Sequence, residues 1–174
     1  GARVASWAAK GWLTSLLPLA APRAGLIHVP INPLLKRAQA AHILRDCGAR
    51  LVIATPARLT SLEQGDVPAG CETVPEGIEL AGDRLAPSAA DPDSLAAILY
   101  TSGSTGLPKG VMLSHANLSL GAVSVAHYLG MAPDDVTLAV LPFAFDYGQN
   151  QLFSTWYAGG RVVPLDYLLA RDVA

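Results

Sequence analysis

A run rich in glycine and hydroxyl residues in the middle of the chain has the composition of a phosphate-binding loop. The run from Tyr100 to Val111 reads YTSGSTGLPKGV. Its glycines let successive backbone N–H groups converge on an anion, and its serine and threonine hydroxyls add further donors. A lysine adds a mobile positive charge suited to phosphate oxygens. The predicted nucleotide-binding residues are Thr101, Ser102, Gly103, Ser104, Thr105, Gly106 and Lys109.

The spacing of this run separates it from better-known loops. A Walker A loop requires G-x-x-x-x-G-K-[ST], but here Lys109 follows Pro108 and precedes Gly110. A dinucleotide fingerprint requires G-x-G-x-x-G, whereas this run offers only G-x-x-G before a proline. A flexible Gly/Ser linker is the simple alternative. Against it, apolar stretches at 95–99 and 111–113 flank the run and predict buried strands.

The elements that would hold this loop alternate between strand and helix. We expect strands at 26–30, 50–54, 95–99, 111–113, 136–141 and 161–164. We expect helices at 8–21, 36–47, 114–128 and 149–157, with a surface excursion from 61 to 90. The alternation predicts an α/β fold, a sheet with helices on both faces. Ligands in such sheets gather at the carboxyl ends of strands, and the glycine-rich loop follows a predicted strand.

Length, composition and charge suit one packed domain and argue against several kinds of partner. The chain has 174 residues, of which 51% are hydrophobic and 15% are charged, and its net charge is −2. No long run of one sign indicates nucleic acid or an anionic membrane as a partner. The most apolar stretch, 12–31, is broken by two prolines and an arginine, so we expect no membrane span. Cys47 and Cys71 are too few for a disulfide framework, which favours a cytoplasmic location.

The stretch from Tyr100 to Val111 resembles, residue for residue, the signature loop of the adenylate-forming (AMP-binding) superfamily. This superfamily comprises acyl-CoA synthetases, luciferase-like ligases and the adenylation domains of peptide synthetases. The resemblance implies an enzyme that joins a small-molecule carboxylate to the α-phosphate of ATP and releases pyrophosphate. The acyl group then passes to a thiol, that of coenzyme A or of a carrier protein. In that family the loop wraps the β- and γ-phosphates, and the position of Thr101 helps to hold Mg²⁺.

The same resemblance implies where the chain lies in a complete enzyme. Residues 1–174 would be a partial N-terminal domain, with its phosphate loop at 100–111. The family's adenine-binding segment, its ribose-binding aspartate and the catalytic lysine of its small C-terminal domain would all follow Ala174. We therefore expect no complete catalytic set here, and no turnover by these residues alone.

Short strings elsewhere point to a finer assignment within acyl-CoA ligases. They are Asn32-Pro-Leu-Leu-Lys36, His42-Ile-Leu-Arg-Asp-Cys47, Phe145-Asp-Tyr-Gly148 and Leu165-Asp-Tyr-Leu-Leu169. Together they look most like the acyl-CoA ligases associated with exosortase systems, so the expected function is AMP-forming acyl-CoA ligation. A non-catalytic nucleotide-binding remnant is a further alternative. A folded remnant that binds no ligand is another, to which the prolines at positions 18 and 22, inside the first predicted helix, lend weight.

Phe145 and Asp146 lie where the family places its acyl-pocket motif and are the predicted substrate residues. In peptide-synthetase adenylation domains the aspartate of such a Phe-Asp pair binds the substrate's α-ammonium, so an aminoacyl adenylation domain is the alternative function. A second interpretation is that Asp146 simply caps the helix that starts near Gly148.

The histidines and tryptophans suggest supporting roles rather than chemistry. His115 belongs to a string that the family also shows, and we expect it to orient the phosphate loop. No acid, cysteine or histidine stands at a metal-ligand spacing from the other three histidines, His28, His42 and His127. We interpret these as structural or exposed, and Trp7, Trp12 and Trp156 as core aromatics.

Overall fold

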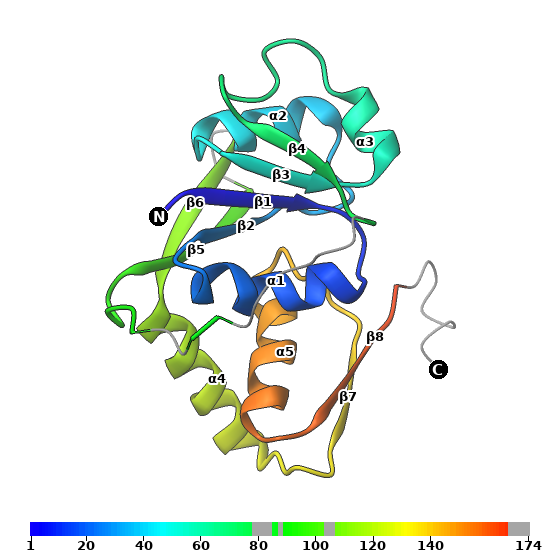
Figure 1. The fold of residues 1–174 in the computed structure, drawn as a ribbon. Helices are drawn as coiled ribbons and strands as arrows, with labels where there is room; N and C mark the ends of the chain where they lie inside the picture. Colours follow the sequence, from blue (N-terminus) through cyan, green and yellow to red (C-terminus); the bar gives the residue numbers. More distant parts are fainter. Residues whose placement is uncertain (78–84, 87–88, 103–106, 167–174) are drawn as a thin grey trace.

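Six strands form one sheet, to which the predicted phosphate loop is attached. The computed structural model describes residues 1–77, 85–86, 89–102 and 107–166. The strands are β1 (Arg3–Trp7), β2 (Ile27–Pro30), β3 (Leu51–Ala54), β4 (Glu72–Pro75), β5 (Leu95–Ser102) and β6 (Pro108–Ser114). Their order across the sheet is β4-β3-β1-β2-β5-β6 (Figure 1). Neighbouring strands are parallel except for β6, which runs antiparallel to β5.

Helices cover both faces of this sheet, which confirms the predicted α/β class. They are α1 (Trp12–Arg23), α2 (Arg37–Asp46), α3 (Pro56–Ser61), α4 (His115–Leu129) and α5 (Asp146–Tyr157). On one face, Ile43 and Leu44 of α2 pack in the same buried cluster as Val29. On the other, Leu17 of α1 packs with Val4. Adjacent residues of a strand point to opposite faces, so both faces of the central strands are buried and largely apolar.

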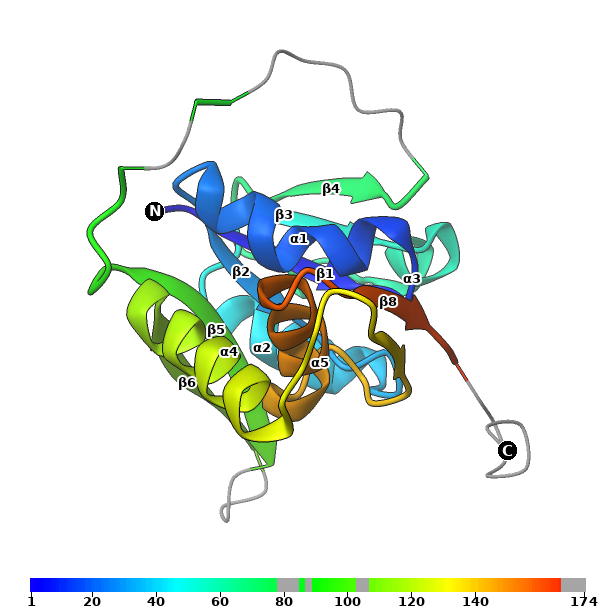
Figure 2. The same ribbon diagram turned by 90° about the horizontal axis from the view of Figure 1, so that it is seen from below.

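A smaller sheet extends the structure beyond the last large helix. Strands β7 (Val136–Ala139) and β8 (Arg161–Pro164) pair in parallel, with α5 as the connection between them. Helices α4 and α5 lie side by side (Figure 2). Phe143, Leu152 and Phe153 form a buried cluster with Ala122 of α4 and Ala139 of β7. This second core holds α5, and with it the predicted substrate residues, against α4.

Three predictions about local structure require correction. The expected excursion from 61 to 90 contains β4, which pairs with β3 at the edge of the sheet. Its side chains are mostly exposed, so the strand lacks the apolar pattern that would have indicated it. The first helix begins at Trp12 rather than residue 8, because the Thr14 hydroxyl accepts a hydrogen bond from the Gly11 N–H at 2.9 Å. Trp12 is 80% exposed and is not a core residue.

One histidine lies in the interior of the large sheet. His28 of β2 is buried, and its Nε2 lies 2.9 Å from the Ser6 hydroxyl of β1. Its Nδ1 is buried without a hydrogen-bond partner among the described residues. Burial lowers the pKa of His28 to about 3, because a charged imidazolium would lose its hydration there. The side chain is therefore neutral in the folded protein at ordinary pH.

We expect this histidine to make the fold sensitive to mild acid. The unfolded chain gains a proton as the pH falls through about 6.5, whereas folded His28 remains neutral until about pH 3. Stability is therefore lost as the pH falls, by about 2 kcal/mol between pH 7 and pH 5. Replacing His28 by glutamine should remove this loss. Urea unfolding of both proteins at the two pH values measures it, and equal losses would contradict the prediction.

Candidate functional site

The β5–β6 hairpin brings two of the predicted nucleotide-binding side chains together. Thr101 of β5 pairs directly with Lys109 of β6, and Ser102 pairs with Pro108. Directly opposed residues of antiparallel strands have Cβ atoms about 5 Å apart and project from the same face. Thr101, Ser102 and Lys109 are all exposed. The Thr101 and Lys109 side chains therefore start from neighbouring positions on one face of the hairpin, at the carboxyl end of β5.

The four remaining loop residues lie between these two strand ends. Gly103, Ser104, Thr105 and Gly106 are outside the described residues, so their predicted role as donors stays a prediction.

The opposite face of the hairpin is tightly packed. Tyr100 pairs with Gly110, and an ideal Cβ on Gly110 would lie 2.7 Å from the Ile98 Cγ2 and 3.1 Å from the Tyr100 Cζ. Tyr100 and Ile98 both pack against the core cluster that contains α2. Glycine at position 110 therefore leaves space for the Tyr100 ring, which the sequence motif alone did not explain.

The predicted substrate residues stand at the start of α5. Phe145 is the N-cap residue and makes no side-chain capping bond, and Asp146 is the first residue of the helix. The interpretation of Asp146 as the cap is therefore wrong. An N-cap residue stands just before the helix, and Asp146 is already inside it. Asp146 is exposed, and a carboxylate in the first turn interacts favourably with the helix dipole.

A small cavity lies beside Asp146. Its volume is about 40 Å³, and it is lined by Asp146, Gln149 and Asn150 of α5, together with residues of α4 and Leu113 of β6. Both amide atoms of Gln149, and Oδ1 of Asn150, are buried without a hydrogen-bond partner among the described residues. Buried polar atoms are normally satisfied, so these amides call for a polar group or water. Sequence reasoning missed them, although two adjacent amides after Phe-Asp were a possible signal.

The cavity and the hairpin site share one side of the sheet. Leu113 lines the cavity, and side chains of a strand alternate between faces, so Lys109 projects from the same face of β6 as Leu113. Thr101 lies opposite Lys109 on that face. The structure thus places the nucleotide-binding candidates and Asp146 on the side of β6 where α4 and α5 pack.

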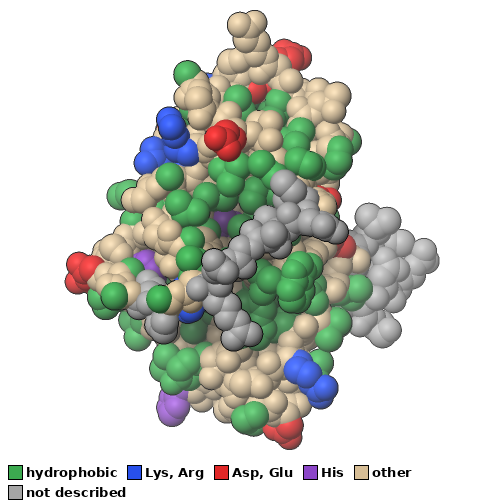
Figure 3. Space-filling view, viewed as in Figure 1, with side chains coloured by type: hydrophobic (Ala, Val, Ile, Leu, Met, Phe, Trp, Pro, Cys, Tyr) green, Lys and Arg blue, Asp and Glu red, His purple; other side chains and the backbone are tan. Residues whose placement is uncertain are grey.

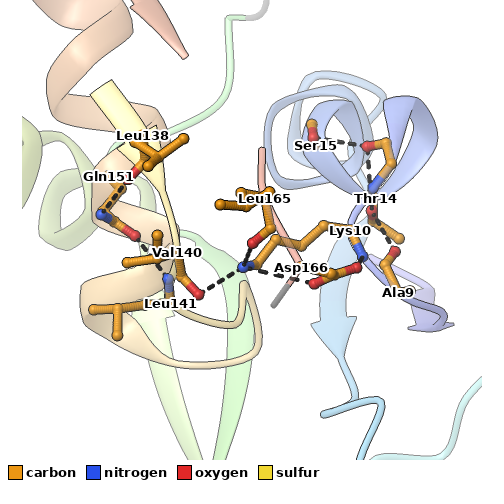
Figure 4. A network of polar contacts seen from close by, with 11 residues as sticks. Ala9, Lys10, Thr14, Ser15, Leu138, Val140, Leu141, Gln151, Leu165 and Asp166 are labelled. Carbon is orange, nitrogen blue, oxygen red and sulfur yellow. Dashed lines mark hydrogen bonds and ion pairs between the residues drawn. The ribbon is translucent and has the colours of Figure 1, made fainter. Parts of the chain in front are cut away.

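A buried lysine ties the small sheet to the large one. Lys10, just after β1, donates to the carbonyl oxygens of Val140 at 2.7 Å and Leu165 at 2.6 Å, and lies 3.6 Å from the Asp166 carboxylate (Figure 4). Burial lowers the pKa of Lys10, and the charge of Asp166 opposes that effect. Since three protein groups engage this ammonium, we interpret it as a structural link.

An open apolar groove runs between α1, α4 and α5. Its volume is about 580 Å³, and Pro18, Pro22 and Trp156 are among its lining residues. Figure 3 shows hydrophobic side chains over the middle of this face, with charged side chains toward its rim. His115 also lines the groove, next to Ser114, which pairs with the first residue of β5. The prediction that His115 orients the phosphate loop is therefore wrong, because it lies at the opposite end of β6.

Comparison with known proteins assigns this arrangement to a family. The sequence matches the AMP-binding enzyme family over residues 1–173. The chain belongs to that family. Among similar curated proteins, syringomycin synthase SyrB1 of Pseudomonas syringae pv. syringae is 33% identical over 167 residues, which are 93% of this AMP-binding chain and 26% of the relative. The L-proline--[L-prolyl-carrier protein] ligase of Pseudomonas fluorescens is 39% identical over 127 residues, which are 67% of this chain and 25% of the relative.

A solved structure of the same fold agrees with this assignment. Apo MatB from Rhodopseudomonas palustris superposes with a TM-score of 0.83 at 28% identity, and the match covers 99% of this AMP-binding chain and 36% of MatB. The ATP-bound form of MatB gives a TM-score of 0.81. The chain thus spans about a quarter to about a third of the length of these relatives.

None of the helices described is both long enough and apolar enough to cross a membrane. Within the described ranges, no group of three or more His, Cys, Asp or Glu side chains could hold a metal ion. Cys47 and Cys71 both carry free thiols.

Proposed function

We propose that residues 1–174 form part of the large N-terminal domain of an ATP-dependent, AMP-forming ligase. This enzyme activates a small-molecule carboxylate as an acyl adenylate and transfers the acyl group to a thiol. The single observation that carries the proposal is the pairing of Thr101 with Lys109 at the carboxyl end of β5, in a chain of the AMP-binding family. A hydroxyl donor beside an exposed ammonium suits phosphate oxygens.

The proposed nucleotide site comprises Thr101, Ser102, Lys109 and the loop residues between them. ATP as the nucleotide is supported by the ATP-bound structure of MatB. The Thr101 hydroxyl is an oxygen ligand of the kind that Mg²⁺ prefers. Mg²⁺ in such sites usually keeps several waters and substrate phosphates as ligands and takes one or two carboxylates from the protein, so the Thr101 hydroxyl would be one ligand among several. When bound, Mg²⁺ would neutralise phosphate charge.

Within this class, we propose an acyl-CoA ligase like those associated with exosortase systems, working in the cytoplasm with coenzyme A as acceptor. The short strings around Asn32, His42 and Phe145 support it. An aminoacyl-adenylating enzyme that loads a carrier protein is the second candidate. It is supported by Asp146, which lies beside a cavity lined by buried amide atoms that have no hydrogen-bond partner among the described residues. A ligand ammonium could bind the Asp146 carboxylate there. The similarity to a prolyl-carrier-protein ligase also supports it.

Carboxylate-dependent exchange of pyrophosphate into ATP separates these candidates. The assay uses the full gene product that contains residues 1–174, with a panel of fatty, aryl and amino acids. Exchange with acids that lack an amine supports the acyl-CoA ligase, and an Asp146→Asn variant should then retain it. Exchange with amino acids alone, abolished by Asp146→Asn, supports the aminoacyl enzyme. Absence of exchange with every acid contradicts the proposed function.

A further inference from the structure

Helix α2 holds both strands of the phosphate hairpin with two side chains one turn apart. Asp46 accepts a hydrogen bond from the Tyr100 hydroxyl at 2.5 Å. The His42 Nε2 lies 3.1 Å from the carbonyl oxygen of Pro108, so this nitrogen carries the proton and donates it. Residues four apart lie on the same face of a helix. One face of α2 therefore contacts β5 and β6 at the same time.

The two contacts fall where the phosphate loop leaves and rejoins the sheet. Tyr100 immediately precedes Thr101, and Pro108 immediately precedes Lys109. A shift of Tyr100 or Pro108 would therefore move the hydroxyl or the ammonium that the proposed function assigns to phosphate binding. The contacts join residues 54 and 66 positions apart in sequence, so they fix the hairpin against a distant part of the chain.

The helix that makes these contacts is itself firmly placed. Ala40, Ile43 and Leu44 are fully buried in the cluster between α2 and the sheet. His42 and Asp46 project from the same turns toward the hairpin. A side chain held by a packed helix is a more precise support than one on a loop.

The Tyr100–Asp46 bond is the stronger of the two contacts. A hydroxyl that donates to an ionised carboxylate forms a shorter bond than a neutral pair and one about twice as strong. Burial, and then this hydrogen bond, raise the pKa of Tyr100, so the phenol keeps its proton and remains a donor. The absence of a side chain on Gly110 leaves the ring free to reach Asp46.

We propose that Asp46, Tyr100 and His42 are positioning residues that set the geometry of the nucleotide site through the strand ends flanking its loop. This inference rests on the proposed function and extends it to α2, a helix that contains none of the predicted ligand-binding residues. The sequence pattern indicated only a structural or exposed position for His42, and no separate role for Asp46 or Tyr100.

The test is a set of variants of the full gene product, assayed by pyrophosphate exchange. Tyr100→Phe removes only the hydroxyl, and we expect it to raise the KM for ATP about 10-fold while the KM for the carboxylate changes less than about twofold. Asp46→Asn keeps an acceptor and should be milder than Asp46→Ala. The double variant Tyr100→Phe/Asp46→Ala should be no worse than Asp46→Ala alone, because both remove the same bond. Tyr128→Phe, at an exposed tyrosine on α4, is the matched control.

Two outcomes would overturn the proposal. One is an unchanged KM for ATP in Tyr100→Phe; the other is an equal rise in both KM values with a lower melting temperature, which indicates a purely structural role. A wild-type protein that shows no pyrophosphate exchange would instead contradict the proposed function. In that case amide hydrogen exchange still tests whether Asp46 and His42 hold the hairpin. Backbone amides at 100–102 and 109–111 should exchange with solvent faster in Tyr100→Phe than in wild type, and equal rates would overturn the proposal.

Discussion

Replacing Lys109 by alanine in the full gene product should lower pyrophosphate exchange by about 10²–10³-fold, the usual effect of removing one preorganised group that stabilises developing charge. Lys109 is exposed at the start of β6 and stands directly opposite Thr101, so its ammonium can reach a phosphate that also contacts the threonine hydroxyl. The stability of the fold should hardly change, because the exposed side chain packs against little.

Two companion variants show whether charge or geometry matters at this position. Lys109→Arg retains the positive charge on a planar fork, so it should recover only part of the exchange. Lys36→Ala removes an exposed lysine at the far end of α2 and should leave exchange unchanged. Calorimetric titration with Mg²⁺-ATP gives a second readout. If the wild-type protein binds Mg²⁺-ATP and Lys109→Ala does not, the protein is not a remnant without a ligand. Full exchange in Lys109→Ala would contradict its assignment to the nucleotide site.

The elements that could be predicted from the sequence are those whose burial or capping leaves a local pattern of residue types. Strands β2, β3 and β5 are apolar runs because both of their faces are covered, and Ser114 accepts a hydrogen bond from the Asn117 N–H at 3.2 Å, as a predicted helix cap should. Strand β4 was not predicted, because an edge strand can form through backbone pairing alone and needs no apolar pattern. Trp12 was wrongly predicted to be a core residue, because it lies on the exposed side of the first turn of α1.

The candidate site was predictable only where a contiguous motif encodes it. The composition of the loop identified Thr101 and Lys109, but their direct pairing depends on the register of the β5–β6 hairpin. The contacts of Asp46 and His42 depend on how α2 packs across the sheet, which no local pattern records. Asp146 was predicted as a substrate residue, with helix capping as a second interpretation because aspartate is common at caps; the structure rules out the capping role, since the N-cap is Phe145.

The second large effect is expected at Gly148, where an alanine should destabilise the protein by about 3 kcal/mol, at the upper end of ordinary overpacking. An ideal Cβ there would lie 2.0 Å from the carbonyl oxygen of Pro142 and 2.7 Å from its carbon. These are backbone atoms, so no rotamer change can relieve the overlap, and either α5 or the turn at Pro142 must move. The same carbonyl oxygen accepts a hydrogen bond from the Phe145 N–H at 3.1 Å.

This turn links stability to the substrate site. Moving it displaces Phe145 and Asp146, so any folded Gly148→Ala protein should show a raised KM for the carboxylate with little change for ATP, the reverse of the pattern expected for Tyr100→Phe. Gly77→Ala is the matched control, because a Cβ there meets no atom of the described residues within 4 Å. Urea unfolding and pyrophosphate exchange measure the two effects. Wild-type stability in Gly148→Ala would mean that α5 does not close against Pro142, and the position assigned to Asp146 would then fail with it.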